Sequence, residues 1–255
     1  MLFNHTKVFG GTLKKLLLPC LFLIGCASYH DPNSSKPFVL EKGVTTYQDV
    51  ARAKGSKGKC LNIQANKYCQ WKNQTNVFQD DLYLKSLTHI EKPLNYEVAV
   101  KTLKLEGPGK MISYGPAGSK INPDSIEWRR FNPLFQGMLK ASGRQLTSKP
   151  VEADQIVRIN FGVEDTASSE KAKRFLELTA FDKVKMLKEK KNVELWKVEV
   201  SSVGGNRDLK KVLPILAAVS QYYVTFPSEV NETMLVSENE LVILAFKDYL
   251  VSGKK

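Results

Sequence analysis

Alternating apolar and polar residues predict several β-strands in the C-terminal two thirds of the chain. A side-chain period of two is typical of strands that bury one face. The alternation is clear at 96–100 and 157–163, and it is longest at 174–187, where a basic turn at 188–192 leads into a further alternation at 196–200. The last two segments predict an antiparallel hairpin with a basic tip. The apolar positions are Tyr96, Val98, Val100, Val157, Ile159, Phe161, Val163, Leu176, Leu178, Ala180, Val184, Met186, Trp196, Val198 and Val200.

Two helices are expected between the strands. Apolar residues spaced three or four apart predict the first at about 129–142, ending at Gly143, which suits the left-handed position after a helix. The second covers about 208–223, with Asp208 as its N-cap. The C-terminal stretch continues as one or two further strands, although 240–250 is equally compatible with a helix. The fold class is therefore α+β, a mainly antiparallel sheet with two helices packed on it.

The N-terminus has the organisation of a secretory leader. Lys7, Lys14 and Lys15 precede an apolar run at 16–24, which is shorter than the roughly 20 residues of a transmembrane helix. An ordinary signal peptide or a buried strand would explain the run as well. The four residues at the end of this run and just after it, Leu23-Ile24-Gly25-Cys26, resemble the cleavage box of bacterial lipoproteins at all four positions.

The resemblance to bacterial lipoproteins implies a cellular location for the protein. In that class the leader is removed and the cysteine is acylated, so Cys26 would become the first residue and the membrane anchor. Two or three acyl chains anchor a protein stably. Ala27 follows in place of Asp, which in Gram-negative lipoproteins favours the outer membrane, here with the folded part facing the periplasm. Residues 26–45 are rich in Ser, Pro and charge, and they predict a lipidated flexible tether.

Two cysteines remain once Cys20 leaves with the leader and Cys26 is acylated. Cys60 and Cys69 form an even pair in an oxidising compartment, which favours a disulfide. A metal site is the rival interpretation, but two thiols with only His89 nearby lack the spacing of a zinc site. No metal and no cofactor are expected. The chain is thus divided into a leader (1–25), a tether (26–45), a basic disulfide-stapled subregion (46–92) and an α+β globular domain (93–255).

Positive charge is concentrated in the subregion at 46–92. The chain has 38 Lys and Arg against 26 Asp and Glu, and removal of three leader lysines leaves it strongly basic. Such charge attracts anionic partners. Export places the chain away from nucleic acid, so an anionic envelope polymer or an envelope protein is the expected partner, and a merely solvated surface is the alternative. The candidate contact residues are Arg52, Lys54, Lys57, Lys59, Lys67 and Lys72, with Tyr68 and Trp71 as aromatic faces.

The sequence contains no recognisable catalytic motif. Histidine is limited to His30 and His89 beyond the leader, and neither belongs to a catalytic or metal pattern. Glu164-Asp165 is the most tempting carboxylate pair, yet neighbours on a strand point to opposite faces. We therefore expect a non-enzymatic binding or assembly role in the envelope. A carboxylate-dependent envelope hydrolase and a surface-exposed lipoprotein are the alternatives.

Residues 93 to about 225 resemble the bacterial lipoprotein family titled domain of unknown function 4136. The resemblance rests on 152–154 leading into a strand that ends at 161–165, and on Leu195-Trp196 followed by 201–204, Asp208-Leu209 and Leu213-Pro214. These motifs are structural in kind. The resemblance implies a lipoprotein domain, but it supplies no activity, and the Cys60–Cys69 segment has no counterpart in it.

Overall fold

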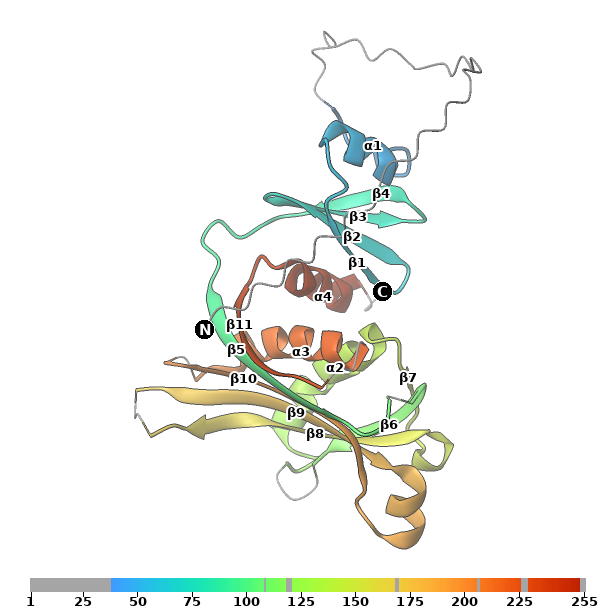
Figure 1. Cartoon of the computed structure of the whole chain (residues 1–255), viewed down its shortest axis with the longest axis vertical. Coiled ribbons are helices and arrows are strands. Elements are labelled where there is room, and N and C mark those ends of the chain that lie inside the picture. Colours follow the sequence, from blue (N-terminus) through green and yellow to red (C-terminus); the bar gives the residue numbers. More distant parts are fainter. Residues whose placement is uncertain are drawn as a thin grey trace, which may run out of the picture. The chain divides into compact units, whose positions relative to one another are not determined.

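The computed structural model describes residues 38–107, 109–117, 121–167, 170–205, 207–225 and 229–252 (Figure 1). The predicted leader, Cys26 and most of the predicted tether lie outside the described residues. Val39–Lys255 form one compact unit. Residues 39–45, expected as the end of the tether, belong to this unit, and Thr45 is buried within it. The folded part therefore begins several residues earlier than the sequence indicates.

A seven-stranded sheet carries most of the predicted strands. Its order is β11-β5-β10-β9-β8-β6-β7, antiparallel except where β6 pairs with β7 and β8. In β5 every second residue from Tyr96 to Thr102 is buried, as the alternation predicts. The bounds are β5 Asn95–Lys104, β6 Met111–Pro116, β7 Gln145–Leu146, β8 Gln155–Asp165, β9 Ala172–Asp182, β10 Glu194–Gly204 and β11 Asn231–Ser237.

The predicted hairpin exists, but its first strand is shorter than expected. β9 pairs with β10 in antiparallel register and ends at Asp182. Val184 and Met186, expected on the buried face, instead lie in the connection, where Lys185–Glu189 form a short π-helical turn, η2. Val184 is 48% exposed. The predicted basic tip is correct, whereas the predicted end of the strand is wrong, because apolar residues spaced by two also fit the first turn of a helical loop.

Two helices cover one face of this sheet, close to the predicted positions. α2 spans Ile126–Ala141 and α3 spans Leu209–Thr225. Ser125 caps α2 by accepting the Trp128 amide, and Gly143 beyond its end has φ +82°, the left-handed conformation predicted for it. The Lys210 amide donates to the Asp208 carboxylate at 3.0 Å, in agreement with an N-cap at Asp208. A 3₁₀ turn, η1, covers Pro150–Glu152.

The prediction of only two helices is wrong. α1 spans Tyr47–Ala53, and α4 spans Leu241–Ser252, so the ambiguous stretch at 240–250 is helical. α4 packs against α2 and α3 and also against strands β1 and β2 of a second sheet. Its buried residues Ile243, Ala245 and Phe246 belong to the same core as the large sheet. α4 therefore joins the two halves of the compact unit (Figure 1).

The second sheet forms the subregion that contains the cysteines. Its strands are β1 Lys59–Ile63, β2 Asn66–Trp71, β3 Gln74–Gln79 and β4 Leu82–Leu87, in antiparallel order β1-β2-β3-β4. Each hairpin turns through two residues, and Gln64, Lys72, Asp80 and Asp81 in these turns have positive φ. Such turns match the twist of the paired strands. The sequence pattern did not predict this sheet.

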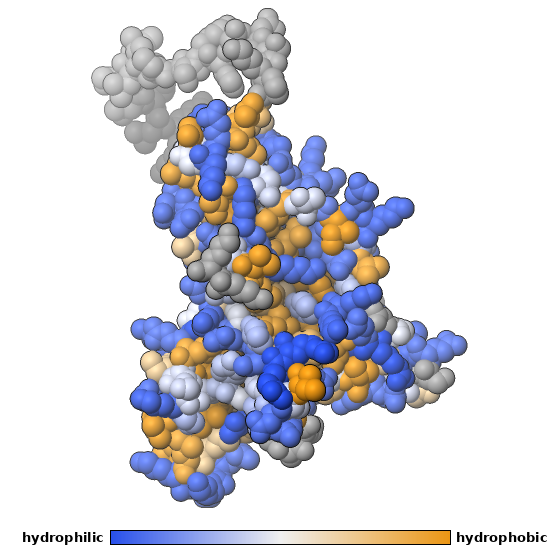
Figure 2. All heavy atoms as spheres, turned by 180° about the vertical axis from the view of Figure 1, so that it is seen from behind, coloured by the Kyte–Doolittle hydropathy of each residue, from blue (hydrophilic) through white to orange (hydrophobic). Residues whose placement is uncertain are grey.

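Both faces of the small sheet are covered, although only one face of the large sheet carries helices α2 and α3. Tyr68 and Val77 face α4 and the main core, whereas Cys69, Trp71 and Phe78 pack beneath α1 against Val50. The α+β class is thus confirmed, with two sheets in place of one. On the face seen in Figure 2, hydrophilic side chains surround smaller apolar patches. In the described part of the chain, none of the helices has the length and apolar character needed to cross a membrane.

Candidate functional site

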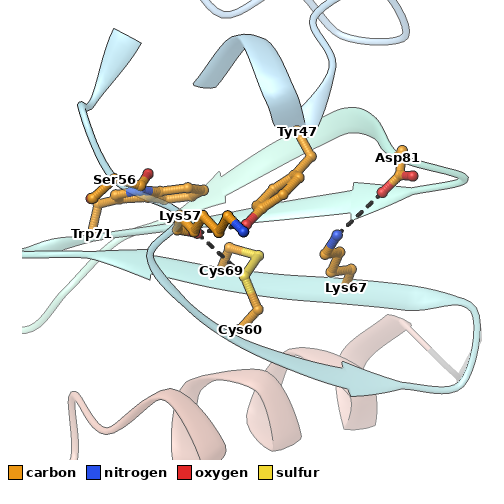
Figure 3. The surroundings of a disulfide bond; sticks show 8 residues. All are labelled: Tyr47, Ser56, Lys57, Cys60, Lys67, Cys69, Trp71 and Asp81. Atoms are coloured by element: carbon orange, nitrogen blue, oxygen red, sulfur yellow. Dashed lines mark hydrogen bonds and ion pairs between the residues drawn. A yellow bond between two sulfur atoms is a disulfide. The ribbon is translucent and has the colours of Figure 1, made fainter. Parts of the chain in front are cut away.

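The predicted disulfide joins Cys60 of β1 to Cys69 of β2 (Figure 3). The two residues are directly opposite partners in the antiparallel pair, with Cα atoms 4.1 Å apart. β1 has no other strand neighbour in the described part of its sheet. The disulfide lies near the open end of this hairpin, away from the turn at 64–65, and it therefore fixes the position of the adjacent residue Lys59.

Ion pairs neutralise two members of the predicted basic cluster. Arg52 lies 3.5 Å from Asp49 on α1, and Lys67 lies 3.3 Å from Asp81. The Lys67 ammonium also lies 3.7 Å from the centre of the Tyr47 ring, a cation–π distance. Figure 3 shows Lys67 directed toward Asp81 and away from Trp71. Arg52 and Lys67 therefore each have an acidic partner within the chain.

Three other lysines line one groove, which we call the lysine groove. Lys54 is the C-cap of α1, Lys59 begins β1, and Lys72 lies in the two-residue turn between β2 and β3. The groove has a volume of about 1120 Å³. None of the ion pairs among the described residues uses these three lysines, and Lys54 has only the Gln74 side-chain amide at 3.2 Å. The structure thus brings together half of the predicted cations.

The predicted aromatic faces are buried, and their assigned role is wrong. Tyr68 is 0% exposed, and its hydroxyl donates to Asp248 of α4 at 3.2 Å. Burial, with the nearby Asp248 charge, raises the pKa of Tyr68 to about 12. Trp71 lines the lysine groove but is only 6% exposed. Neither ring can therefore stack openly on a sugar, because β2 is covered on both faces.

Trp71 instead holds the loop that carries the lysines. Its indole Nε1 donates to the Ser56 carbonyl at 2.9 Å. Gly58 has φ +70°, and a Cβ at this position would lie 2.7 Å from Trp71 Cε2. Glycine suits this position because it has no Cβ to meet the ring and because it adopts positive φ with little strain. The close packing holds the loop between Lys54 and Lys59 against the Trp71 ring.

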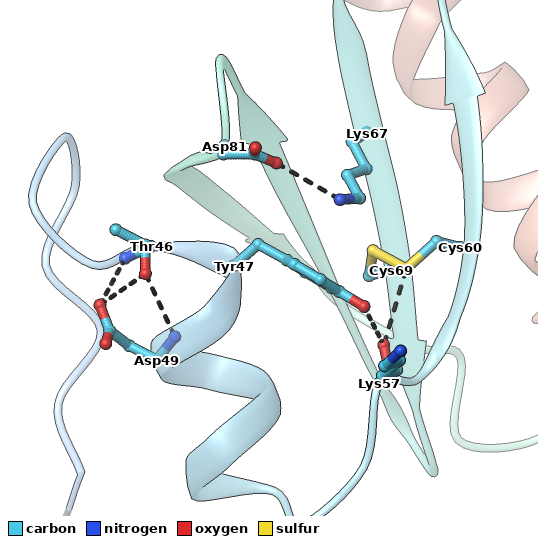
Figure 4. A network of polar contacts seen from close by, with 8 residues as sticks. All are labelled: Thr46, Tyr47, Asp49, Lys57, Cys60, Lys67, Cys69 and Asp81. Carbon is cyan, nitrogen blue, oxygen red and sulfur yellow. Dashed lines mark hydrogen bonds and ion pairs between the residues drawn. A yellow bond between two sulfur atoms is a disulfide. The ribbon is translucent and has the colours of Figure 1, made fainter. Parts of the chain in front are cut away.

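A polar network anchors the same loop to α1 (Figure 4). Thr46 accepts the Asp49 amide at 3.2 Å, while Asp49 accepts the Thr46 amide at 3.0 Å, which makes a reciprocal cap. The Thr46 hydroxyl also donates to the Asp49 carboxylate at 2.7 Å, and this bond, together with the one from the Thr46 amide, lowers the pKa of Asp49. The Tyr47 hydroxyl then donates to the Lys57 carbonyl at 2.7 Å. Lys57 therefore contributes a backbone acceptor to the network, and the disulfide sulfur of Cys60 lies 3.8 Å from the same carbonyl oxygen.

The opposite wall of the groove comes from the connection between β11 and α4. Ser237, Asn239 and Glu240 line it. The Gln70 side-chain amide donates to the Asn239 carbonyl at 3.1 Å, and the Asn239 side chain in turn bonds both backbone groups of Ile90. The sequence did not predict these residues, because nothing local relates positions about 170 residues apart.

The histidine and the carboxylate pair considered for catalysis or metal binding each contact another side chain of the fold. His89 Nε2 lies 3.0 Å from the Thr75 hydroxyl. Glu164 lies 3.7 Å from Lys173, and Asp165 lies 2.6 Å from Arg207, so this carboxylate pair is divided between two cations. Among the residues that the structure describes, no three His, Cys, Asp or Glu side chains are grouped to hold a metal ion. The lysine groove is the candidate functional site.

Comparisons with known proteins give only distant similarities. No family model matches the chain, and no curated protein matches it. A PelC dodecamer from Paraburkholderia phytofirmans is similar over 51% of this chain and 93% of its own, with 10% identity and a TM-score of 0.31. A PDZ domain protein from Parabacteroides distasonis is similar over 68% of this chain and 50% of its own, with 8% identity and a TM-score of 0.37. Similarity at this level supports no functional conclusion.

Proposed function

We propose that the protein is a lipid-anchored envelope protein that binds anionic envelope material through the lysine groove, without catalysis. The observation that carries the proposal is the convergence of Lys54, Lys59 and Lys72 on one groove without acidic ion-pair partners among the described residues. Lysine ammonium groups act as point charges toward phosphate or carboxylate. The groove lining includes a single acidic residue, Glu240, and it therefore favours an anion.

Two features support the envelope placement. The predicted leader at 1–25, followed by Cys26, has the pattern of exported, acylated proteins. The Cys60–Cys69 disulfide is typical of an oxidising compartment outside the cytoplasm. We propose the periplasmic face of the outer membrane as the location, because Ala27 follows Cys26. The resemblance of 93–225 to the domain of unknown function 4136 family stays a prediction, since no family model matches.

Binding of tripolyphosphate, an anion without an apolar part, tests the proposal. A soluble chain that starts at residue 27 retains the whole compact unit and can be titrated by calorimetry. Replacement of both Lys59 and Lys72 by Gln should weaken binding about tenfold, since each partly exposed charge contributes up to about 1 kcal/mol. Added salt should weaken wild-type binding in the same direction.

The matched control removes equal charge elsewhere. Lys101 on β5 and Lys210 on α3 are exposed and line none of the groove, so their joint replacement by Gln should leave affinity within about twofold of wild type, given screening at this range. Equal losses in both double variants would show binding by net charge alone and would contradict the proposed site. Turnover of an envelope glycan or ester that disappears on a single Asp or Glu substitution would contradict the non-enzymatic role.

A further inference from the structure

A second, apolar groove adjoins the lysine groove. It has a volume of about 490 Å³, within the size range of small-molecule sites. Its walls come from four elements, β1, α3, β11 and the first turn of α4. The side chains that line it include Leu61, Val219, Tyr222, Met234, Leu235 and Leu241.

The two grooves meet along a shared border. Glu240 lines both of them. On β1, Lys59 faces the lysine groove while the next residue, Cys60, lines the apolar one. On the other side, Ser237 lines the lysine groove and the preceding residue, Val236, lines the apolar groove. Cys60, one of the two cysteines that clamp β1 to β2, therefore lies next to the border between the cationic and the apolar groove.

We propose, on the basis of the anion-binding function above, that the two grooves together bind a phosphate-headed lipid. Its headgroup lies among Lys54, Lys59 and Lys72, and its alkyl tail lies in the apolar groove. Charge complementarity selects the headgroup end, because the lysine groove is two charges positive after Glu240 is counted. The apolar lining selects the tail.

The mostly apolar lining of this groove favours an alkyl tail over a sugar. The Tyr223 hydroxyl, which borders it, already donates to Glu232. Val219, Met234 and Leu241 present no side-chain donors for hydrogen bonds. Against these three side chains a sugar hydroxyl would find no hydrogen-bond partner, which is costly for buried polar groups. An alkyl chain has no such requirement.

Titration with hexyl, octyl and decyl phosphate tests the tail. Affinity should rise about fourfold for each added methylene that the groove buries, and the increase should stop once the groove is full. Gln at both Lys59 and Lys72 should weaken every member of the series by a similar factor. Glu240→Gln should strengthen every member about twofold to fivefold, since it removes the one repelling carboxylate. Affinity that is independent of chain length would overturn the lipid proposal, while continued dependence on the lysines would leave the anion-binding function intact.

Two groove variants separate tail binding from folding. Leu235 is 71% exposed and Tyr222 is 46% exposed, so Leu235→Asn and Tyr222→Asn should retain the wild-type melting temperature within a few degrees. Both should reduce the gain per methylene and leave tripolyphosphate binding unchanged. Decyl phosphate with a terminal diazirine should label β1, α3, β11 or the first turn of α4. Labelling confined to other elements, or an unchanged gain per methylene in both variants, would overturn the proposal.

Discussion

Gly55 and Gly58 show at the scale of single residues how the loop between Lys54 and Lys59 is held in place. Both have positive φ, +67° and +70°, but a Cβ at Gly55 would meet nothing within 4 Å, whereas at Gly58 it would clash with Trp71. Gly55→Ala should therefore cost only backbone strain, about 1 kcal/mol of unfolding free energy. Gly58→Ala should cost about 2 to 4 kcal/mol, because overpacking adds to the strain.

Urea unfolding of the two alanine variants measures this difference, and tripolyphosphate titration shows its consequence for the site. Gly58→Ala should weaken tripolyphosphate binding, since the displaced loop carries Lys54 and Lys59, while Gly55→Ala should bind as wild type does. Equal destabilisation by the two substitutions would contradict the role assigned to the contact with Trp71.

Tyr68 gives a prediction about pH. Its pKa is about 12 in the folded protein against 10.0 ordinarily, so the unfolded chain ionises first and high pH favours unfolding. The stabilising contribution is complete below about pH 10 and is lost as pH rises through about 12. From about pH 9 to about pH 11, the wild type should lose about 1 kcal/mol more unfolding free energy than Tyr68→Phe does. Urea unfolding at both pH values checks this, and equal losses in the two proteins would contradict it.

The same residue shows what the sequence could not reveal. Tyr68 and Trp71 stand among lysines in β2, and such mixing predicts a solvated surface. The partners that bury them are α1 on one side and α4 on the other, and Asp248 of α4 is 180 residues from Tyr68. The lysines could be predicted as candidates because charge is visible locally. Their division into paired and groove-lining groups depends on the tertiary contacts.

At the scale of elements, predictability follows how each element is buried. β5 has one polar face and one buried face, so the alternation of polar and apolar residues was enough to predict this strand. α4 packs against helices on one side and a sheet on the other, and a helix with apolar residues on most of its surface has no clear period. Its sequence was therefore compatible with strand or helix. The cap residues Thr46 and Asp49 offered a local signal for α1 that the charge of the segment obscured.

The disulfide supports one element in particular, the edge strand β1. The two cysteines are nine residues apart, and the chain-entropy model gives roughly 2.5–3 kcal/mol for so short a loop. Replacement of both Cys60 and Cys69 by Ser should lower the unfolding free energy by up to this amount, and hydrogen exchange of β1 amides should accelerate more than that of β9. Because Lys59 adjoins Cys60, tripolyphosphate affinity should fall as well. Unchanged exchange in β1 would contradict the proposed clamp.

At the scale of the whole molecule, function depends on whether the chain is attached to a membrane. The described unit supplies the grooves, and the proposed acyl anchor at Cys26 would hold them near lipid phosphates, which raises their effective concentration. Cys26→Ser should abolish labelling by a fatty acid and leave an unprocessed precursor in the producing cell. Cys20→Ser, six residues earlier in the predicted leader, is the matched control and should be labelled and processed normally. Metabolic labelling followed by mass measurement of the product checks both variants. Unchanged labelling of Cys26→Ser would remove the anchor from the proposal, whereas the groove titrations on the soluble chain would stand independently of it.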